Sequence, residues 1–117
     1  PITLFKADIK IDSGNIYEKD YFSIKKSDLN SEIRAKQSYA TIKIIKKFLK
    51  KYPKVKFSRQ RGETSSYRRR NSKDHKLNIF KNLKENFNLI RISDNEKYPA
   101  YFYLYGKKYV LKIFKSE

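Results

Sequence analysis

Net positive charge limits the structures open to this chain more than any other feature of its sequence. Twenty-nine Lys and Arg residues stand against 12 Asp and Glu residues, so that 117 residues carry a formal charge of +17. Charge of one sign opposes compaction because the groups repel one another. A folded state therefore needs enough apolar surface to overcome this repulsion, and a polyanionic partner would relieve it.

The apolar content is sufficient for one small core. Hydrophobic residues make up 38% of the chain and include ten Tyr and eight Phe, whereas Gly and Pro contribute three residues each. A disordered or low-complexity chain has few aromatic residues and is often rich in Gly and Pro. The composition therefore predicts a single folded domain over residues 1–117.

Several classes of site and location are excluded by what the sequence lacks. It has no cysteine and a single histidine, which excludes disulfides, Cys-ligated zinc and multi-histidine metal sites. We expect no metal and no cofactor. Without an apolar run long enough to span a bilayer, or a signal peptide, we expect an intracellular protein, cytoplasmic or in an equivalent compartment that contains nucleic acid, with no membrane partner.

The N-terminal residues predict a β-hairpin. Apolar and charged residues alternate over residues 3–12, which is typical of a half-buried strand. Asp12, Ser13, Gly14 and Asn15 form a turn signal, and an extended pattern resumes over residues 16–24.

The clearest element is an amphipathic helix that Pro53 ends. Ser27, Asp28 and Ser31 are candidates for its N-cap. At 100° per residue, one face is expected to pack against the protein and the opposite face is basic. The packing face comprises Thr41, Ile44, Ile45, Phe48, Leu49 and Tyr52, and the basic face comprises Lys36, Lys43, Lys46, Lys47 and Lys50.

The middle of the chain predicts a short strand, a basic loop, a second helix and another strand. The strand covers residues 55–57, and the loop covers residues 58–73. Ser72 is expected to cap the second helix, whose inner face would carry Leu77, Phe80, Leu83 and Phe87. Residues 89–92 are typical of a strand.

A second hairpin ends the chain. Its strands are expected over residues 98–105 and 108–114, with a turn at Gly106-Lys107. The predicted order is therefore ββαβ, basic loop, αβββ, a small α+β domain with a mainly antiparallel sheet and two helices.

The Arg-rich loop at about 58–73 is the strongest functional signal. Arg guanidinium groups bind phosphate through two parallel hydrogen bonds, and solubility does not require arginine. The arginines predicted to contact nucleic acid are Arg59, Arg61, Arg68, Arg69 and Arg70.

The lysine face of the first helix supports the same interpretation. No Asp or Glu occurs between Ile33 and Arg61, so the ion pairs that usually stabilise an exposed helix are missing. Unbalanced charge of this kind suggests a partner outside the helix, although lysines on the outer face of a helix are common.

One face of the C-terminal hairpin combines rings and cations, as surfaces that bind single strands do. It comprises Tyr101, Tyr103, Tyr105, Lys108 and Lys112. The alternative is that these tyrosines are simply favoured in a strand.

Catalytic signals are weaker. His75, Tyr67 and Glu63 together with nearby arginines are the residues available for a small metal-independent nuclease. The single histidine has no second histidine or cysteine with which to form an acid–base pair.

We therefore predict a nucleic-acid-binding protein that contacts phosphates through Lys and Arg, such as a ribonucleoprotein component or a part of a larger protein complex. The sequence does not separate RNA from DNA. The alternatives are the nuclease centred on His75 and an inhibitor of a nucleic-acid-processing enzyme.

Overall fold

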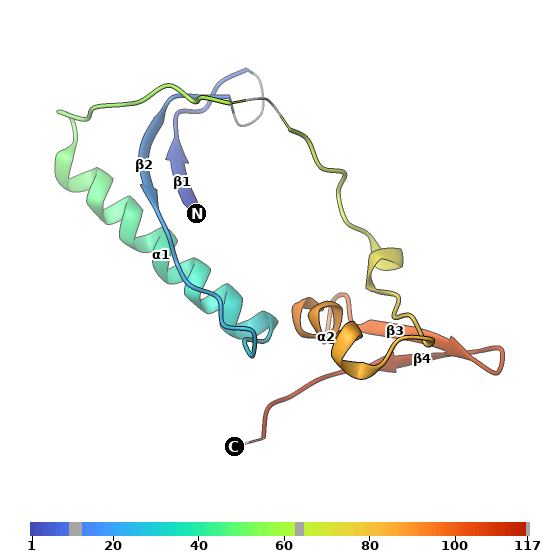
Figure 1. Cartoon of the computed structure of the whole chain (residues 1–117). Helices are drawn as coiled ribbons and strands as arrows, with labels where there is room; N and C mark the ends of the chain where they lie inside the picture. The colour runs from blue at the N-terminus through green and yellow to red at the C-terminus, as the bar shows by residue number, and fades with distance from the viewer. Residues whose placement is uncertain (10–12, 63–64, 117) are drawn as a thin grey trace. The chain divides into compact units, whose positions relative to one another are not determined.

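The computed structural model describes residues 1–9, 13–62 and 65–116 (Figure 1). Within them the elements follow the order β1 (Ile2–Phe5), β2 (Ile16–Asp20), α1 (Asn30–Lys51), a 3-10 helix (Ser72–His75), α2 (Leu83–Ile92), β3 (Ala100–Leu104) and β4 (Lys107–Leu111). β1 pairs with β2 and β3 pairs with β4, both antiparallel. The predicted α+β class with two helices is confirmed.

The chain divides into two compact units. The N-terminal unit comprises Pro1–Ile24 and Arg34–Ser66, and the C-terminal unit comprises Lys25–Ile33 and Tyr67–Glu117. Helix α1 therefore begins in the second unit and continues in the first. That the chain is one folding domain remains a prediction.

The β1–β2 hairpin depends on Gly14. A Cβ atom at this position would lie 1.7 Å from the carbonyl oxygen of Lys6, far inside contact distance. The same close approach allows the Lys6 N–H to donate to the carbonyl of Asn15 at 2.9 Å. Both strands are shorter than predicted, and Ile9 is fully exposed instead of lying on an inner face.

Helix α1 packs on a narrower face than its sequence predicts. Ala40 and Ile44 are buried, and the rings of Phe48 and Tyr17 lie 5.3 Å apart. Ile45, Leu49 and Tyr52 are 41%, 61% and 65% exposed, so their predicted packing is wrong. The small two-stranded β1–β2 sheet offers little surface to cover a long helix.

Residues 55–57 do not form the predicted strand. Instead, Ser58 makes an isolated antiparallel bridge with Ile16, with both backbone hydrogen bonds at 2.8 Å. One pair of hydrogen bonds attaches the start of the Arg-rich loop to β2 without extending the sheet.

The predicted second helix is two separate elements because two asparagines cap them. Asn71 caps the 3-10 helix, which ends where Lys76 becomes extended. Asn82 caps α2 through a reciprocal pair of hydrogen bonds with Glu85. Phe80 and Leu83 are consequently exposed, whereas Leu77 is buried. Residues 89–92, predicted as a strand, are the last turn of α2.

The core of the C-terminal unit forms where α2 meets the β3–β4 hairpin. Leu77, Ile90 and Ala100 are buried there, and partly buried side chains pack around them, namely Leu89, Phe102, Leu111 and Ile113. The Leu77 N–H donates to the carbonyl of Tyr101 at 2.7 Å, which joins the residue after the 3-10 helix to β3.

The turn of this hairpin differs from the prediction by one residue. Leu104 pairs with Lys107, so the turn residues are Tyr105 and Gly106, with φ values of 50° and 71°. A tight turn of this kind requires positive φ at both positions. The change shifts the register by two, so the predicted faces keep their residues and Tyr103 now lies opposite Lys108.

Candidate nucleic-acid interface

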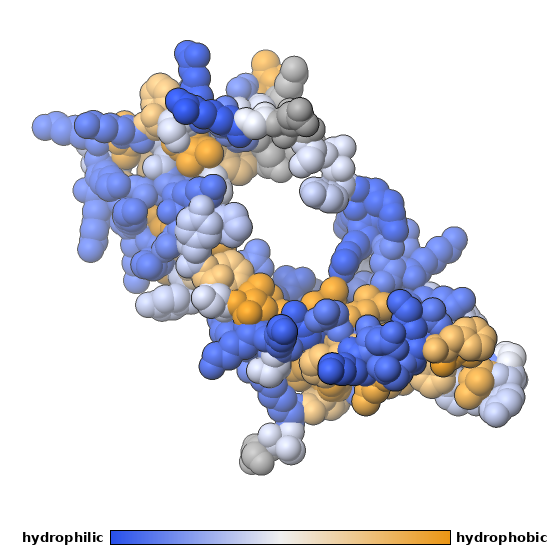
Figure 2. Space-filling view, viewed as in Figure 1, coloured by the Kyte–Doolittle hydropathy of each residue, from blue (hydrophilic) through white to orange (hydrophobic). Residues whose placement is uncertain are grey.

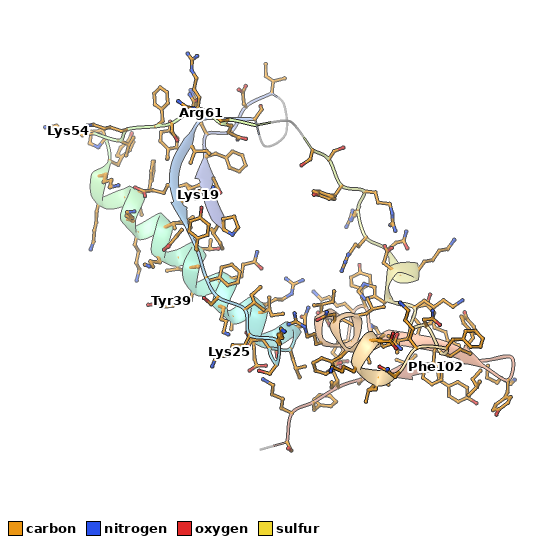
Figure 3. The ribbon with its side chains drawn as sticks, viewed as in Figure 1. Lys19, Lys25, Tyr39, Lys54, Arg61 and Phe102 are labelled. Carbon is orange, nitrogen blue, oxygen red and sulfur yellow. The ribbon has the colours of Figure 1, made fainter. Side chains whose placement is uncertain are left out.

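The Arg-rich loop presents exposed arginines from a backbone held at its start. Besides the Ile16–Ser58 bridge, the side-chain amide of Gln60 donates to the carbonyl of Gly14 at 2.8 Å. Arg59 and Arg61 on either side of Gln60 are exposed, as are Arg69 and Arg70 further on. Figure 3 shows Arg61 near the start of β2. Glu63 lies outside the described residues.

Arg68 differs from the other arginines because it has a carboxylate partner. Its guanidinium forms a two-pronged ion pair with Asp74, in which Nη1 lies 2.8 Å from Oδ2 and Nη2 contacts Oδ1. Hydrogen bonding from Arg68 is the main reason that the pKa of Asp74 lies well below its usual range, and a hydrogen bond from the Asn71 N–H is the second reason. The pair also raises the pKa of Arg68. The ion pair thus links Arg68 in the loop to Asp74 in the 3-10 helix.

The lysine face of α1 is partly neutralised from within the unit. Lys43 Nζ lies 2.9 Å from Asp20, Lys47 Nζ lies 2.9 Å from Glu18, and Lys51 also pairs with Glu18. The Lys51 and Lys47 hydrogen bonds lower the pKa of Glu18, and the Lys43 hydrogen bond lowers that of Asp20. The acids missing from the helix are supplied by β2, which the sequence of the helix alone does not show.

Lys46 and Lys50 form no ion pair within the described part of the chain. They line a shallow depression of about 360 Å³ together with Tyr39, Ile42, Lys43 and Lys47. Tyr39 projects outward from α1 (Figure 3) and is 75% exposed. Lys36 is half-buried. The depression therefore offers two unneutralised ammonium groups beside one accessible ring.

The tyrosines of the C-terminal hairpin already interact with cations of the same unit. Lys108 Nζ lies 4.3 Å from the ring centre of Tyr101, and Lys76 Nζ lies 5.4 Å from that of Tyr103. Tyr101 is only 8% exposed, which leaves no room for a base to stack on it. Tyr105 is 89% exposed at the turn.

Lys112, predicted to belong to the same face, is not free either. Its Nζ forms an ion pair with Glu96 at 2.9 Å. Of this predicted group, the structure brings Tyr101, Tyr103 and Lys108 together, but chiefly in contact with one another and with Lys76.

His75 is buried in a structural hydrogen-bond network. The Ser93 hydroxyl donates to the carbonyl of Leu89 at 2.7 Å, and its oxygen lies 2.9 Å from His75 Nδ1. Because a hydroxyl carries one proton, Nδ1 must donate to Ser93. The ring also stacks on Tyr98 at 5.9 Å, whereas Tyr67 is 92% exposed. This geometry favours a packing role for His75.

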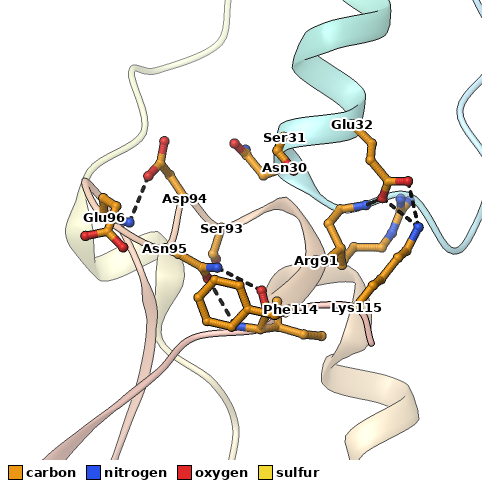
Figure 4. A pocket seen from close by; sticks show the side chains of 12 residues that line it. Asn30, Ser31, Glu32, Arg91, Ser93, Asp94, Asn95, Glu96, Phe114 and Lys115 are labelled. Carbon is orange, nitrogen blue, oxygen red and sulfur yellow. Dashed lines mark hydrogen bonds and ion pairs between the residues drawn. The ribbon is translucent and has the colours of Figure 1, made fainter. Parts of the chain in front are cut away.

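The C-terminal unit contains a pocket of about 470 Å³ that the sequence did not predict (Figure 4). Asn95 exchanges two hydrogen bonds with the backbone of Ile113, and the Asn30 side chain donates to the carbonyl of Ile92 at 2.8 Å. Lys115 pairs with Glu32 at 2.6 Å and helps the Leu29 N–H to lower the pKa of that carboxyl. These polar groups hold chain segments of the unit together. No sequence motif marks them.

No group of three or more His, Cys, Asp or Glu side chains among the described residues is placed to bind a metal ion. No helix in the described ranges has the length and apolar character needed to cross a membrane.

Comparison with known proteins identifies the fold. No protein-family model and no curated protein matches the sequence. Among solved structures, the methionyl-tRNA formyltransferase from Clostridium thermocellum matches 98% of this chain with a TM-score of 0.77 and 19% identity, and the match covers 50% of that protein. The chain spans about half the length of that protein, and it is similar in fold to one half of a methionyl-tRNA formyltransferase.

Proposed function

We propose that this chain binds nucleic acid through contacts with phosphates, and that RNA is the first ligand to test. Two observations carry the proposal: arginines in the described part of the Arg-rich loop are exposed without carboxylate partners, and Lys46 and Lys50 on α1 likewise form no ion pair with described residues. The arginines are Arg59, Arg61, Arg69 and Arg70. Neutralising phosphates releases condensed counterions and so provides affinity without base-specific contacts.

The choice of RNA is supported by the fold neighbour, whose name gives a transfer RNA as its substrate. A likeness at 19% identity concerns fold alone, so the likeness selects a ligand to try. The net charge of +17 favours a polyanion over a small anion, because a small anion would neutralise little of it.

A second candidate is that the chain forms half of an enzyme that transfers a formyl group. The fold match over 98% of the chain favours it. The described residues show no catalytic constellation, since His75 is buried against Ser93 and Tyr98 and Asp74 is paired with Arg68. In this candidate, the reacting groups belong to another part of the enzyme and this chain holds the acceptor.

Binding measurements on three ligands separate the two candidates. They are methionyl-tRNA, the same tRNA without its amino acid, and duplex DNA with a similar number of phosphates. A phosphate-directed binder holds both tRNAs equally, and its affinity falls steeply with salt. An acceptor-binding half of an enzyme prefers methionyl-tRNA over the tRNA without its amino acid. Weak binding to all three at low salt would contradict the nucleic-acid proposal.

The inhibitor alternative remains a prediction. It requires an acidic protein surface as the ligand, and competition between such a protein and RNA for the same arginines would be its signature.

A further inference from the structure

The end of the Arg-rich loop is closed by hydrogen bonds that all lie within the C-terminal unit. Arg68 forms its two-pronged ion pair with Asp74, six positions further along the chain, and its Nη1 also donates to the carbonyl of Arg69 over 3.4 Å. Asp74 accepts from the Asn71 N–H at 2.7 Å, and its own N–H donates to the carbonyl of Asn71 at 3.1 Å. These contacts close a ring from Arg68 to Asp74, called here the clasp.

The backbone inside the clasp carries two cations without a carboxylate partner. Arg69 and Arg70 are exposed and form no ion pair within the described part of the chain. Residues 65–71 belong to no helix or strand, so a regular ladder of backbone hydrogen bonds does not fix these arginines. Figure 2 shows mostly hydrophilic residues (blue) along the stretch that leads into the 3-10 helix. The clasp therefore supplies order that secondary structure does not.

The ion pair of the clasp has the geometry of a strong one. Exposed ion pairs usually contribute little, because solvent screens them and two long side chains lose freedom. Two parallel hydrogen bonds between a guanidinium and a carboxylate are more favourable, and the Asp74 side chain is only 17% exposed. Because the pKa of Asp74 lies well below its usual range, chiefly through Arg68, the pair stays ionised at neutral pH.

Asp74 has two possible effects on phosphate binding, and they differ in sign. If it only neutralises Arg68, it removes one cation from the surface and weakens binding. If it orders the backbone around Arg69 and Arg70 before a phosphate arrives, it strengthens binding, because less conformational freedom is then lost in the complex. Neutralisation needs one contact with Arg68. Asp74 also holds the backbone beyond the two arginines through the Asn71 N–H, which favours the ordering effect.

We propose that the clasp pre-organises Arg69 and Arg70 for phosphate, with Arg68 and Asp74 as positioning residues. Arg68 then acts through its neighbours and does not itself contact the nucleic acid. This inference rests on the proposed function, since it concerns how the same loop binds phosphate. It predicts that an acidic residue strengthens the binding of a polyanion, which net charge alone would not predict.

Asp74→Asn tests the sign of the effect. It breaks the ion pair, keeps an oxygen that can accept from the Asn71 N–H, and makes the net charge more positive. Glu96→Gln is the matched control, since it breaks the exposed pair with Lys112 in the same unit and changes the charge equally. We expect Asp74→Asn to weaken binding of a labelled tRNA by about threefold to tenfold, whereas Glu96→Gln should keep or tighten it. Unchanged or tighter binding by Asp74→Asn would overturn the proposal.

A second background separates positioning from general damage to the unit. With Arg69 and Arg70 both replaced by Ala, Asp74→Asn should change the tRNA affinity no further, because the clasp acts through those two side chains. A loss that persists in this background would make Asp74 merely structural. Arg68→Lys keeps the charge without the two-pronged geometry and should weaken binding by about threefold. It decides the question if circular dichroism shows that Asp74→Asn does not fold, and unchanged affinity would then count against the clasp.

Trypsin reports the clasp without RNA. Cleavage after Arg69 and Arg70, identified by mass spectrometry, should be about threefold faster or more in Asp74→Asn, because proteolysis requires local opening of the chain. Glu96→Gln should keep the wild-type rate. Unchanged cleavage in Asp74→Asn overturns this inference alone. Failure of the wild-type chain to bind tRNA would overturn the proposed function together with it.

Discussion

At the scale of single residues, intramolecular partners decide which cations are available. Arg68 and Lys112 have carboxylate partners, whereas Arg69 and Arg70 are exposed without one in the described chain. A cation whose hydrogen bonds are already used must give them up to bind a phosphate. Two cations that count equally in the sequence therefore do not contribute equally to a binding surface.

Arg69→Ala and Arg70→Ala should each weaken RNA binding by about 1 kcal/mol, the contribution of one charge-assisted phosphate contact. Lys112→Ala removes the same charge but a paired one, and it should change the affinity little. Fluorescence anisotropy with one labelled RNA at constant salt measures all three variants. A loss with Lys112→Ala as large as with Arg70→Ala would show that total charge alone governs binding.

His75 should matter for stability and not for binding. Because its ring is buried against Tyr98 and donates to Ser93, His75→Ala should lower the free energy of unfolding by about 1–3 kcal/mol. RNA affinity of the folded variant should remain unchanged. Urea denaturation gives the stability, and incubation with labelled RNA in EDTA tests for cleavage. Metal-independent cleavage that the substitution abolishes would restore the nuclease alternative.

At the scale of elements, contacts between α1 and the β1–β2 hairpin organise the N-terminal unit. Glu18 of β2 is only 7% exposed and accepts from both Lys47 and Lys51. Gly14 lets the two strands of the hairpin approach closely. A carboxylate and a glycine therefore determine how the helix and the hairpin fit together.

Glu18→Gln should lower the free energy of unfolding at neutral pH by about 1–2 kcal/mol, because Lys47 and Lys51 both lose the carboxylate with which they pair. The folded state lowers the pKa of Glu18 from its ordinary value of 4.5. Its contribution is therefore complete above that pH and is lost as the pH falls through the folded-state pKa. Acid unfolding followed by circular dichroism should be less steep in the variant. Glu96→Gln, at an exposed pair, serves as the control and should leave the profile unchanged.

Gly14→Ala should disrupt the β1–β2 hairpin, because its Cβ would overlap the backbone of Lys6. We expect a loss of more than about 2 kcal/mol in the free energy of unfolding, as for other severe backbone clashes. Gly62→Ala meets no atom within 4 Å and is strained only by its φ of 112°, so it should cost about 1 kcal/mol. Similar melting curves for the two variants would mean that the hairpin opens without cost.

At the scale of the whole molecule, the charge of +17 is distributed over two compact units. A surface that contacts several phosphates loses affinity linearly in a plot of log affinity against log salt. The slope reports how many phosphates are neutralised, so it measures the interface as a whole instead of any one residue.

The slope should be about −4 or steeper for tRNA if at least five phosphates are contacted. Replacing Arg69 and Arg70 together by Ala should reduce its magnitude by about 2, because each lost contact removes about one released counterion. Titrations at four salt concentrations measure it. A slope near zero would remove the phosphate-directed mechanism, whatever the affinity at low salt.

Local periodicity in the sequence was sufficient to predict elements whose signals lie within a few neighbouring residues. The helix that ends before Pro53, the two hairpins and the α+β class follow from such patterns. It was not sufficient where neighbouring signals compete. Asn71 caps the 3-10 helix in place of Ser72, and Asn82 caps α2, so that one predicted helix is two elements.

The sequence by itself determined the net charge, the absence of thiols and the alternation of polar and apolar residues. The tertiary structure decided which cations remain free, since Glu18 and Asp20 reach the lysines of α1 from a strand more than 20 residues away. It also decided that His75 is buried and that Ile42, Ile45 and Leu49 are not. The physical reason is that ion pairing and burial depend on which surfaces meet in space, and short-range patterns do not specify those meetings.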